Sequence, residues 1–262
     1  PSRGLGDVYK RQILMFMLHS LLLKSHILLG VIALLLFWLP MFSRKGSALH
    51  RRSGRYYAYL MKAVALSGLV MTCMVWLDPI EIKGAGLMVN GQIPQRKLEF
   101  LMLINLFLFL LSLLSWVTIR HATGSLLCKQ NREPLKHWSY QAPVWLLVVV
   151  APYAAWQGFQ FSMPLVMVFA GISLVTCFSI LSYLHTKTVT ANRWLIEHAS
   201  AMIGSGIAAY TAFFAFGGRA LFAELLTGHW MMLPWLLPSL IGVPATIWFK
   251  RRLAQPLRNS AS

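Results

Sequence analysis

Seven stretches of mainly apolar residues follow one another along the chain, separated by polar breaks or by glycine and proline. A helix needs about 20 such residues to cross the hydrocarbon core of a bilayer. Each stretch reaches that length, so the sequence predicts an all-α fold, a polytopic membrane helix bundle with seven transmembrane helices. The expected spans are 21–42, 56–77, 98–119, 138–158, 163–184, 194–216 and 230–249.

The composition leaves too little polar surface to cover a soluble globule, since 57% of the residues are hydrophobic and only 12% are charged. The net charge of +17 comes from cations in short connections between the apolar stretches. These cations form no continuous basic surface interleaved with aromatic residues, so we expect a lipid bilayer and no nucleic acid as partner. The three cysteines form no CxxC pair, which argues against a disulfide framework or a zinc ribbon.

The distribution of lysine and arginine predicts the orientation, because these residues are retained on the cytoplasmic side of a membrane. Fifteen cations fall in one set of connections and five in the other. The first set is Arg44, Lys45, Arg51, Arg52, Arg55, Arg120, Lys129, Arg132, Lys136, Lys187, Arg193, Lys250, Arg251, Arg252 and Arg258. The second set is Lys24, Lys83, Arg96, Lys97 and Arg219. We therefore expect the N-terminus outside and the C-terminus inside.

The two ends of the chain differ from the apolar body. Residues 1–12 resemble a translated cloning or sequencing-adaptor remnant and are excluded from the fold prediction. Residues 13–258 are expected to form a single seven-helix domain, followed by a short tail at 259–262.

Two connections carry local structural signals. The longest outer connection, 78–97, contains Asn90-Gly91, a dipeptide that favours the tight turn of a β-hairpin, so we expect a small hairpin lying against the helix ends. The connection 157–162 is short and aromatic, which predicts a tight helical hairpin between the fourth and fifth spans.

The span 194–216 is rich in small residues, which let helix backbones approach one another in lipid. Gly204, Ser205 and Ala209 are the expected helix-packing positions, and we expect this helix at the centre of the bundle. Glu197 and His198 lie near its start, where an ionisable pair is costly in a membrane and therefore indicates a function. The alternative is that Glu197 only stabilises the helix N-terminus beside Arg193.

Histidines are the strongest candidates for cofactor binding, because neutral imidazole is a common ligand of metals and haem. Such centres are built between facing helices of a bundle. The candidate ligands are His26, His198, His50 and His121. His26 shares a helix stripe with Gly30 and Ala33, which would leave a groove for a flat macrocycle or a lipid. For each residue the alternative is a histidine that only tolerates an interface, a polar loop or a helix contact.

A dense cationic cluster opens the second span. Arg51, Arg52 and Arg55 are candidates for binding a phosphate or an anionic lipid headgroup, because forked guanidinium groups and helix N-terminal donors suit that geometry. The alternative is a cytoplasmic anchor that only sets the orientation of the helix.

The segment His50-Arg51-Arg52-Ser53-Gly54-Arg55-Tyr56, together with His26 and the Glu197-His198 helix, resembles a large bacterial family of uncharacterised inner-membrane proteins over most of residues 20–250. The resemblance implies a multi-pass protein of the bacterial inner (cytoplasmic) membrane. More remotely, histidines on hydrophobic helices resemble the membrane cytochrome b and ferric-reductase-like superfamily, which implies b-type haem and transmembrane electron transfer. Members of that superfamily commonly carry two histidines about two heptads apart on one helix. No expected span here does, so the resemblance is to a single haem with ligands from different helices.

Three functions remain open on the sequence alone. The first is an inner-membrane protein that binds haem b or a metal through helix-borne histidines and takes part in electron transfer. The second is binding or transport of a lipid or small molecule within the bundle. The third is a non-catalytic assembly role with a membrane protein partner or as a homo-oligomer. The HExxH motif of zinc hydrolases is absent from the sequence.

Overall fold

The computed structural model describes residues 2–88, 92–217, 230 and 233–254. Within these residues the chain is helical and contains no extended strand. The long helices are α1 (Ser2–Phe42), α2 (Ala48–Leu77), α4 (Gln95–Cys128), α5 (Trp138–Gln160), α6 (Pro164–His185), α7 (Arg193–Ala212) and α9 (Leu233–Ala254). The shorter elements are α3 (Pro79–Lys83), 3₁₀ turns at Gly84–Gly86 and Glu133–Lys136, and a π-helix at Phe213–Gly217.

Among the described residues, five of the long helices are long and apolar enough to cross a membrane, namely α1 from Ile13 onward, α2, α4, α5 and α6. The chain is therefore a multi-pass membrane protein with an all-α fold. Helices α7 and α9 coincide with the last two predicted spans but do not belong to these five. Helix α7 carries the polar residues Arg193, Glu197 and His198, and α9 contains Pro238 and Pro244.

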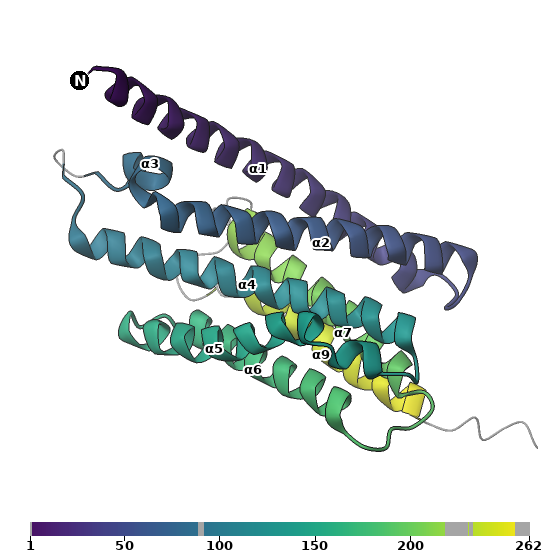
Figure 1. The fold of residues 1–262 in the computed structure, drawn as a ribbon. Coiled ribbons are helices and arrows are strands. Elements are labelled where there is room, and N and C mark those ends of the chain that lie inside the picture. Colours follow the sequence, from purple (N-terminus) through teal and green to yellow (C-terminus); the bar gives the residue numbers. More distant parts are fainter. Residues whose placement is uncertain (1, 89–91, 218–229, 231–232, 255–262) are drawn as a thin grey trace, which may run out of the picture.

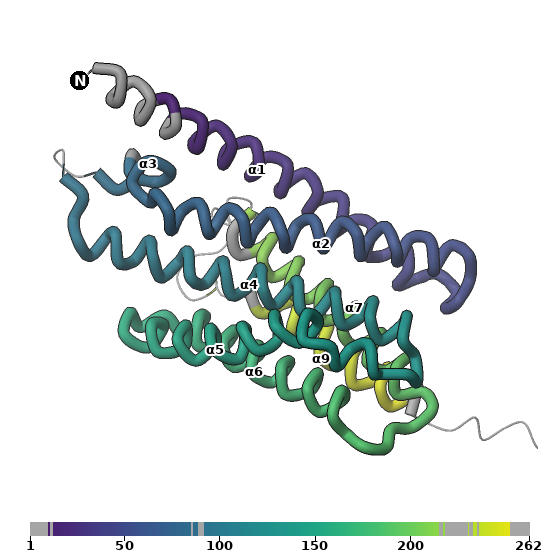
Figure 2. Tube along the Cα trace, in the orientation of Figure 1, coloured from purple at the N-terminus to yellow at the C-terminus, as the bar shows by residue number. Residues whose placement is uncertain are grey.

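The helices form two layers (Figures 1 and 2). Helices α1, α2, α4 and the α5–α6 pair lie side by side in chain order. Helix α7 packs on one face of that row, mainly against α4, and α9 packs against α7. Helix α4 contacts α2, α5, α6 and α7, whereas α7 contacts α1, α4 and α9. The prediction that the small-residue helix α7 occupies the centre is therefore wrong. The long apolar helix α4 does, because its leucine-rich surface is buried by neighbours on several sides.

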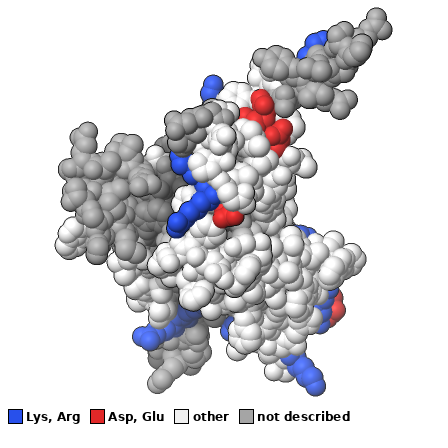
Figure 3. Space-filling view, turned by 90° about the vertical axis from the view of Figure 1, so that its left-hand side faces the viewer, with Lys and Arg blue, Asp and Glu red and all other residues white. Residues whose placement is uncertain are grey.

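The connections gather at two opposite ends of the bundle. Those between α1 and α2, α4 and α5, and α6 and α7 lie on the right of Figure 1, and those between α2 and α4 and between α5 and α6 lie on the left. We call the first the cationic end, defined by the connections 43–47, 129–137 and 186–192. Figure 3 looks onto the opposite end, where charged side chains of both signs are scattered over a largely uncharged surface. The connections are thus grouped as the predicted topology requires.

Several helix boundaries differ from those predicted. Helix α1 begins at Ser2, far before the expected position 21, and its helical backbone includes the residues that the sequence analysis set aside. Helix α2 begins eight residues before the expected position 56, because Ser47 caps it by accepting a hydrogen bond from the backbone N–H of His50 at 3.2 Å. The length of hydrocarbon crossed does not limit a helix that continues on polar residues beyond the bilayer.

The connection after α2 starts as a short helix. Asp78 accepts a hydrogen bond from the backbone N–H of Glu81 at 3.0 Å, and Pro79 occupies the first helical position of α3. Residues 89–91, with the Asn90-Gly91 turn, lie outside the described residues, as do 218–229 with Arg219, and 255–262 with the predicted tail. The tight α5–α6 hairpin is confirmed, since α5 ends at Gln160 and α6 begins at Pro164.

A glycine makes the α5–α6 hairpin tight. A Cβ atom at Gly158 would lie 2.9 Å from Cβ of Val166, closer than two side chains pack. The hairpin joins a core shared by α4, α5 and α6, in which Leu110, Leu147 and Ala170 are fully buried. A second core joins α1, α2, α4 and α7 around Tyr57 and Ile119, and it lies next to the polar residues described below.

Candidate functional site

The cationic end holds three of the four histidines that the sequence nominated. His50 lies in the first turn of α2, His121 near the end of α4 and His198 in the second turn of α7. Each of these helices begins or ends at the cationic end (Figure 1), so the three histidines lie toward that end of the bundle on three separate helices.

His121 lies at the centre of a buried polar cluster. Its Nε2 atom lies 3.2 Å from Oε2 of Glu197, and its Nδ1 atom lies 3.0 Å from the hydroxyl of Tyr140. Arg193 donates from Nε to the other carboxylate oxygen of Glu197 at 2.7 Å. His121 is 2% exposed and Glu197 is 6% exposed. The cluster therefore connects α4, α5 and α7 through groups that have little access to water.

The charges of this cluster compensate one another. The Glu197 carboxylate has partners on both oxygens, one from α4 and one from the preceding turn of α7. The Tyr183 ring on α6 meets the His121 ring edge-on with centroids 5.6 Å apart. Glu197 does more than interact with Arg193 at the start of its own helix, because its contact with His121 also links α7 to α4.

His198 and His50 are held in a different way from His121. Nδ1 of His198 lies 2.8 Å from the carbonyl of Ala122, and Nδ1 of His50 lies 3.0 Å from the carbonyl of Pro40. A carbonyl oxygen only accepts hydrogen bonds, so Nδ1 carries the proton in both rings. In a neutral imidazole the lone pair then resides on Nε2. Metal-binding histidines are typically oriented through their second nitrogen in this way.

The Pro40 carbonyl has a second partner. It is one of the last four carbonyls of α1, for which the helix itself provides no N–H donor. Lys45 donates to it at 3.0 Å and to the Met41 carbonyl at 2.6 Å. Partial burial lowers the pKa of the Lys45 ammonium. The end of α1 is thus tied to the start of α2, and His50 is fixed at this junction.

The register between α2 and α7 brings His50 and His198 to the same level. The hydroxyls of Tyr57 and Ser205 lie 2.9 Å apart and join the two helices. Both helices start at the cationic end, so they run in the same direction (Figure 1). His50 precedes Tyr57 by seven residues, and His198 precedes Ser205 by seven. Seven residues are about two helical turns, so each histidine lies on the face that carries the hydroxyl contact.

His26 lies far from this end. Its Nδ1 atom is 2.8 Å from the hydroxyl of Ser67 on α2. Ser67 follows His50 by 17 residues, which is roughly 25 Å along a helix. The stripe beside it serves helix packing at Ala33, which is 1% exposed, whereas a Cβ atom at Gly30 would meet no described atom within 4 Å. His26 therefore does not share a site with the other three histidines.

The arginine cluster lies on the first turns of α2, as predicted, and Arg51, Arg52 and Arg55 are exposed. Arg51 donates to the carbonyl of Gly46 at 2.7 Å, which ties it to the α1–α2 connection. Exposed guanidinium groups at this position agree both with an anchor and with binding of anionic headgroups.

The small residues of α7 have unequal roles. Ser205 is fully buried and bonds Tyr57, and Ala209 packs against the second core. A Cβ atom at Gly204 would meet no described atom within 4 Å, so the described residues show no close helix contact at this predicted packing position. Sequence reasoning missed Gly206, where a Cβ atom would lie 2.3 Å from the Phe37 ring. Glycines two positions apart lie on different faces of a helix, and only the fold reveals which one faces α1.

Among the described residues, no group of three or more histidine, cysteine, aspartate or glutamate side chains is placed to hold a metal ion. His121 uses both ring nitrogens in the cluster with Tyr140 and Glu197. Of the four nominated histidines, His50 and His198 are the two whose Nδ1 atom bonds a backbone carbonyl.

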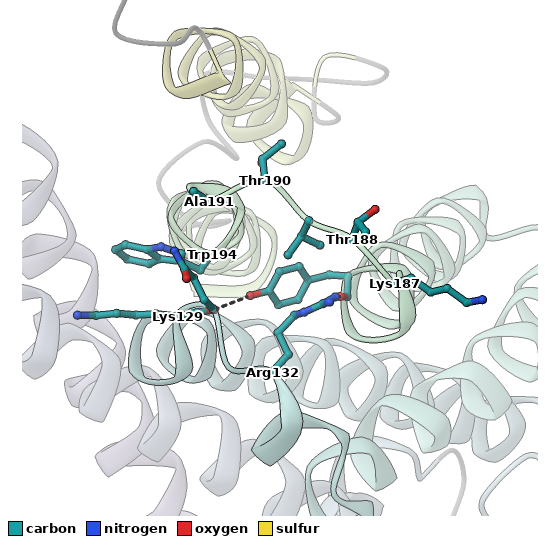
Figure 4. Close-up of a pocket in the computed structure, with 10 residues that line it drawn as sticks. Lys129, Arg132, Lys187, Thr188, Thr190, Ala191 and Trp194 are labelled. Carbon is teal, nitrogen blue, oxygen red and sulfur yellow. Dashed lines mark hydrogen bonds between the residues drawn. The ribbon is translucent and has the colours of Figure 1, made fainter.

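A pocket of about 440 Å³ opens at the cationic end next to the His121 cluster. It lies between the end of α4, the end of α6 and the start of α7 (Figure 4). Lys129, Arg132 and Lys187 contribute positive charge, and Tyr183 and Trp194 contribute aromatic surface. In the sequence, these three cations indicate only the orientation of the chain in the membrane. No spacing in the sequence relates residues 129–132 to residues 183–194, so the pocket emerges only from the fold.

Comparison of the chain with protein-family models, with curated proteins and with solved structures gave no match. The function must therefore be argued from the residues of this chain.

Proposed function

We propose that this chain is a seven-span protein of the bacterial inner membrane that binds haem b or a transition-metal ion between α2 and α7, with a role in membrane electron transfer. His50 and His198 are the proposed ligands. The N-terminus is outside and the cationic end faces the cytoplasm. His26 and His121 are not ligands in this proposal, because one is distant and the other has both nitrogens engaged.

The observation that carries this proposal is that two imidazoles on different helices make the same hydrogen bond, from Nδ1 to a backbone carbonyl. Each donates its Nδ1 hydrogen to a backbone carbonyl, so each has Nε2 free of that bond and available as a ligand. The Tyr57–Ser205 contact supports a common level for the two rings. A bis-histidine site needs this combination of fixed ring orientation and ligands from separate helices.

The residues around the two histidines have defined tasks. The carbonyls of Pro40 and Ala122 orient the rings, and the Tyr57–Ser205 contact holds the spacing of α2 and α7. Bound haem b or a redox-active metal ion would supply one-electron chemistry at this position. Glu197 directly precedes His198 in the chain, and its contact with the buried His121 fixes α7 against α4.

A reduced-minus-oxidised absorption spectrum tests the haem form of the proposal. The full chain is expressed with haem precursor, purified in detergent and measured with dithionite and in air. We expect a b-type α-band in the unaltered protein and its loss in both His50→Ala and His198→Ala, because each substitution removes one axial ligand. Metal analysis of the same samples tests the metal-ion form.

Two control variants accompany this measurement. His185→Ala removes an exposed histidine at the same end, and His26→Ala removes one that bonds Ser67 far along α2. Both are expected to keep the band. A protein that folds but shows neither the band nor a bound transition metal would refute the proposal, as would a band that survives both ligand substitutions.

Reporter fusions test the proposed topology. A fluorescent-protein fusion in the connection 129–137 and at the C-terminus is expected to fluoresce, because both positions face the cytoplasm. An alkaline phosphatase fusion in the connection 78–94 is expected to be active, because this reporter folds only outside. The opposite pattern at these positions would reverse the orientation drawn from the lysine and arginine distribution.

A further inference from the structure

The pocket between α4, α6 and α7 combines positive charge with aromatic surface. Three cations line it, and among the described residues no aspartate or glutamate does. Tyr183 and Trp194 form apolar walls, and Thr188 and Thr190 add hydroxyl groups. A pocket of about 440 Å³ is in the size range of small-molecule sites, and it exceeds what a bare inorganic ion needs.

Arg132 forms a rigid part of this pocket. Its guanidinium donates from Nη1 to the carbonyl of Tyr183 and from Nη2 to the carbonyl of Thr186 at 2.8 Å, and it stacks 5.6 Å from the centre of the Tyr183 ring. These contacts satisfy carbonyls at the end of α6. A guanidinium has five N–H donors, so Arg132 retains donors beyond these two bonds.

Lys129 and Lys187 stand on opposite sides of the pocket. In Figure 4 their side chains extend away from one another at the two ends of the pocket, which Tyr183 also lines. Long flexible stems allow either ammonium group to turn toward a bound anion. Lys129 has a φ of 48°, a left-handed conformation in which glycine is favoured over lysine. The Tyr183 hydroxyl donates to its carbonyl at 3.3 Å and supports this conformation.

We infer that this pocket binds an organic phosphate, that is, a phosphoryl group joined to a glycerol or other small body. The three cations that line the pocket suit the charge of a phosphoryl group, and charge-assisted hydrogen bonds to phosphate are among the strong ones in proteins. The aromatic walls and the volume accommodate the organic part. The ligand is either the headgroup of an anionic phospholipid or a soluble phosphate ester, since both present the same chemistry at the membrane surface. This inference does not depend on the metal or haem site.

Two probes distinguish the two sources. Phosphatidylglycerol in phosphatidylcholine bilayers tests the lipid, with native mass spectrometry of the full chain after mild delipidation to count retained molecules. Glycerol 3-phosphate, titrated calorimetrically into the detergent-purified chain, tests the soluble ester. The test variant is Lys129→Gln combined with Lys187→Gln, and the matched control is Arg44→Gln, an exposed cation at the same end that does not line the pocket.

The unaltered chain and Arg44→Gln are expected to bind one of the two probes, and the double variant to bind it at least about tenfold more weakly. Loss of phosphatidylglycerol retention identifies a lipid headgroup, and loss of the glycerol 3-phosphate response identifies a soluble ester. Helical circular dichroism verifies that each variant folds, and Lys187→Glu repeats the test with a single substitution. The inference is overturned when neither probe binds the unaltered chain, or when the double variant and Lys187→Glu bind as tightly as Arg44→Gln.

Discussion

Replacing Glu197 with alanine is expected to lower the free energy of unfolding by about 1–3 kcal/mol, the cost typical of leaving a buried hydrogen-bonding group without its partner. Glu197 is 6% exposed and accepts from both His121 and Arg193. Without the carboxylate, His121 loses the partner of Nε2 in a site with little access to water. Arg193 loses its contact to the same residue, and α7 loses its polar link to α4.

Equilibrium unfolding of the purified chain in mixed micelles with increasing denaturing detergent measures this change. The matched control is Glu133→Ala, which removes a carboxylate of another ion pair at the same end. Glu133 is exposed and paired with Lys136 at 2.7 Å, and the hydrogen bond from Lys136 lowers the pKa of its carboxyl. Because water solvates the Lys136 ammonium once the Glu133 carboxylate is removed, stability is expected to stay nearly constant. Equal losses in the two variants would show that burial of Glu197 does not matter.

Gly206→Ala is expected to destabilise the bundle by about 1–3 kcal/mol, the usual cost of overpacking a core. A Cβ atom at Gly206 would lie 2.3 Å from the Phe37 ring. That ring cannot move away freely, because Tyr57 and Tyr210 contact it with centroids 5.5 Å and 6.2 Å distant. The substitution therefore forces α7 away from α1 or displaces a packed aromatic cluster.

Gly204→Ala is the control for this prediction, since it makes the same chemical change on the same helix. A Cβ atom there meets no described atom within 4 Å. We expect unchanged stability or a gain of about 0.5–1 kcal/mol, because alanine restricts the unfolded chain and favours the helix. Thermal unfolding of both variants in one detergent provides the comparison. A larger loss at position 204 than at 206 would contradict the packing of α7 against α1.

The positions of the helices could be predicted from the sequence because hydrophobic length is a local property. Each expected span coincides with a long helix in the described residues, and the tight hairpin before Pro164 could be recognised from its short connection. The start of α3 also had a local signal, since Asp78-Pro79 is a helix-start pair. The hairpin expected at Asn90-Gly91 lies outside the described residues and stays a prediction.

The candidate site could be predicted only in part. His50, His121 and His198 were identified as candidate imidazole ligands, and Glu197 with His198 as an ionisable pair that is costly in a membrane. Their assignment to separate roles required the fold, because His121 and Glu197 are 76 residues apart in the chain. The same holds for the pocket cations, which come from two connections that the sequence does not relate.

By itself the sequence determined the all-α membrane character, the places of the long helices and the end of the bundle at which cations accumulate. These follow from the length of apolar stretches and from charge in the connections. The tertiary structure alone decided that α4 is central, that Gly206 and not Gly204 meets α1, and that His121 pairs with Glu197. The physical reason is that lipid accepts an apolar helix on every face, so hydrophobicity does not reveal which face turns inward. Only the packed helices bring the polar side chains of separate spans within hydrogen-bond distance.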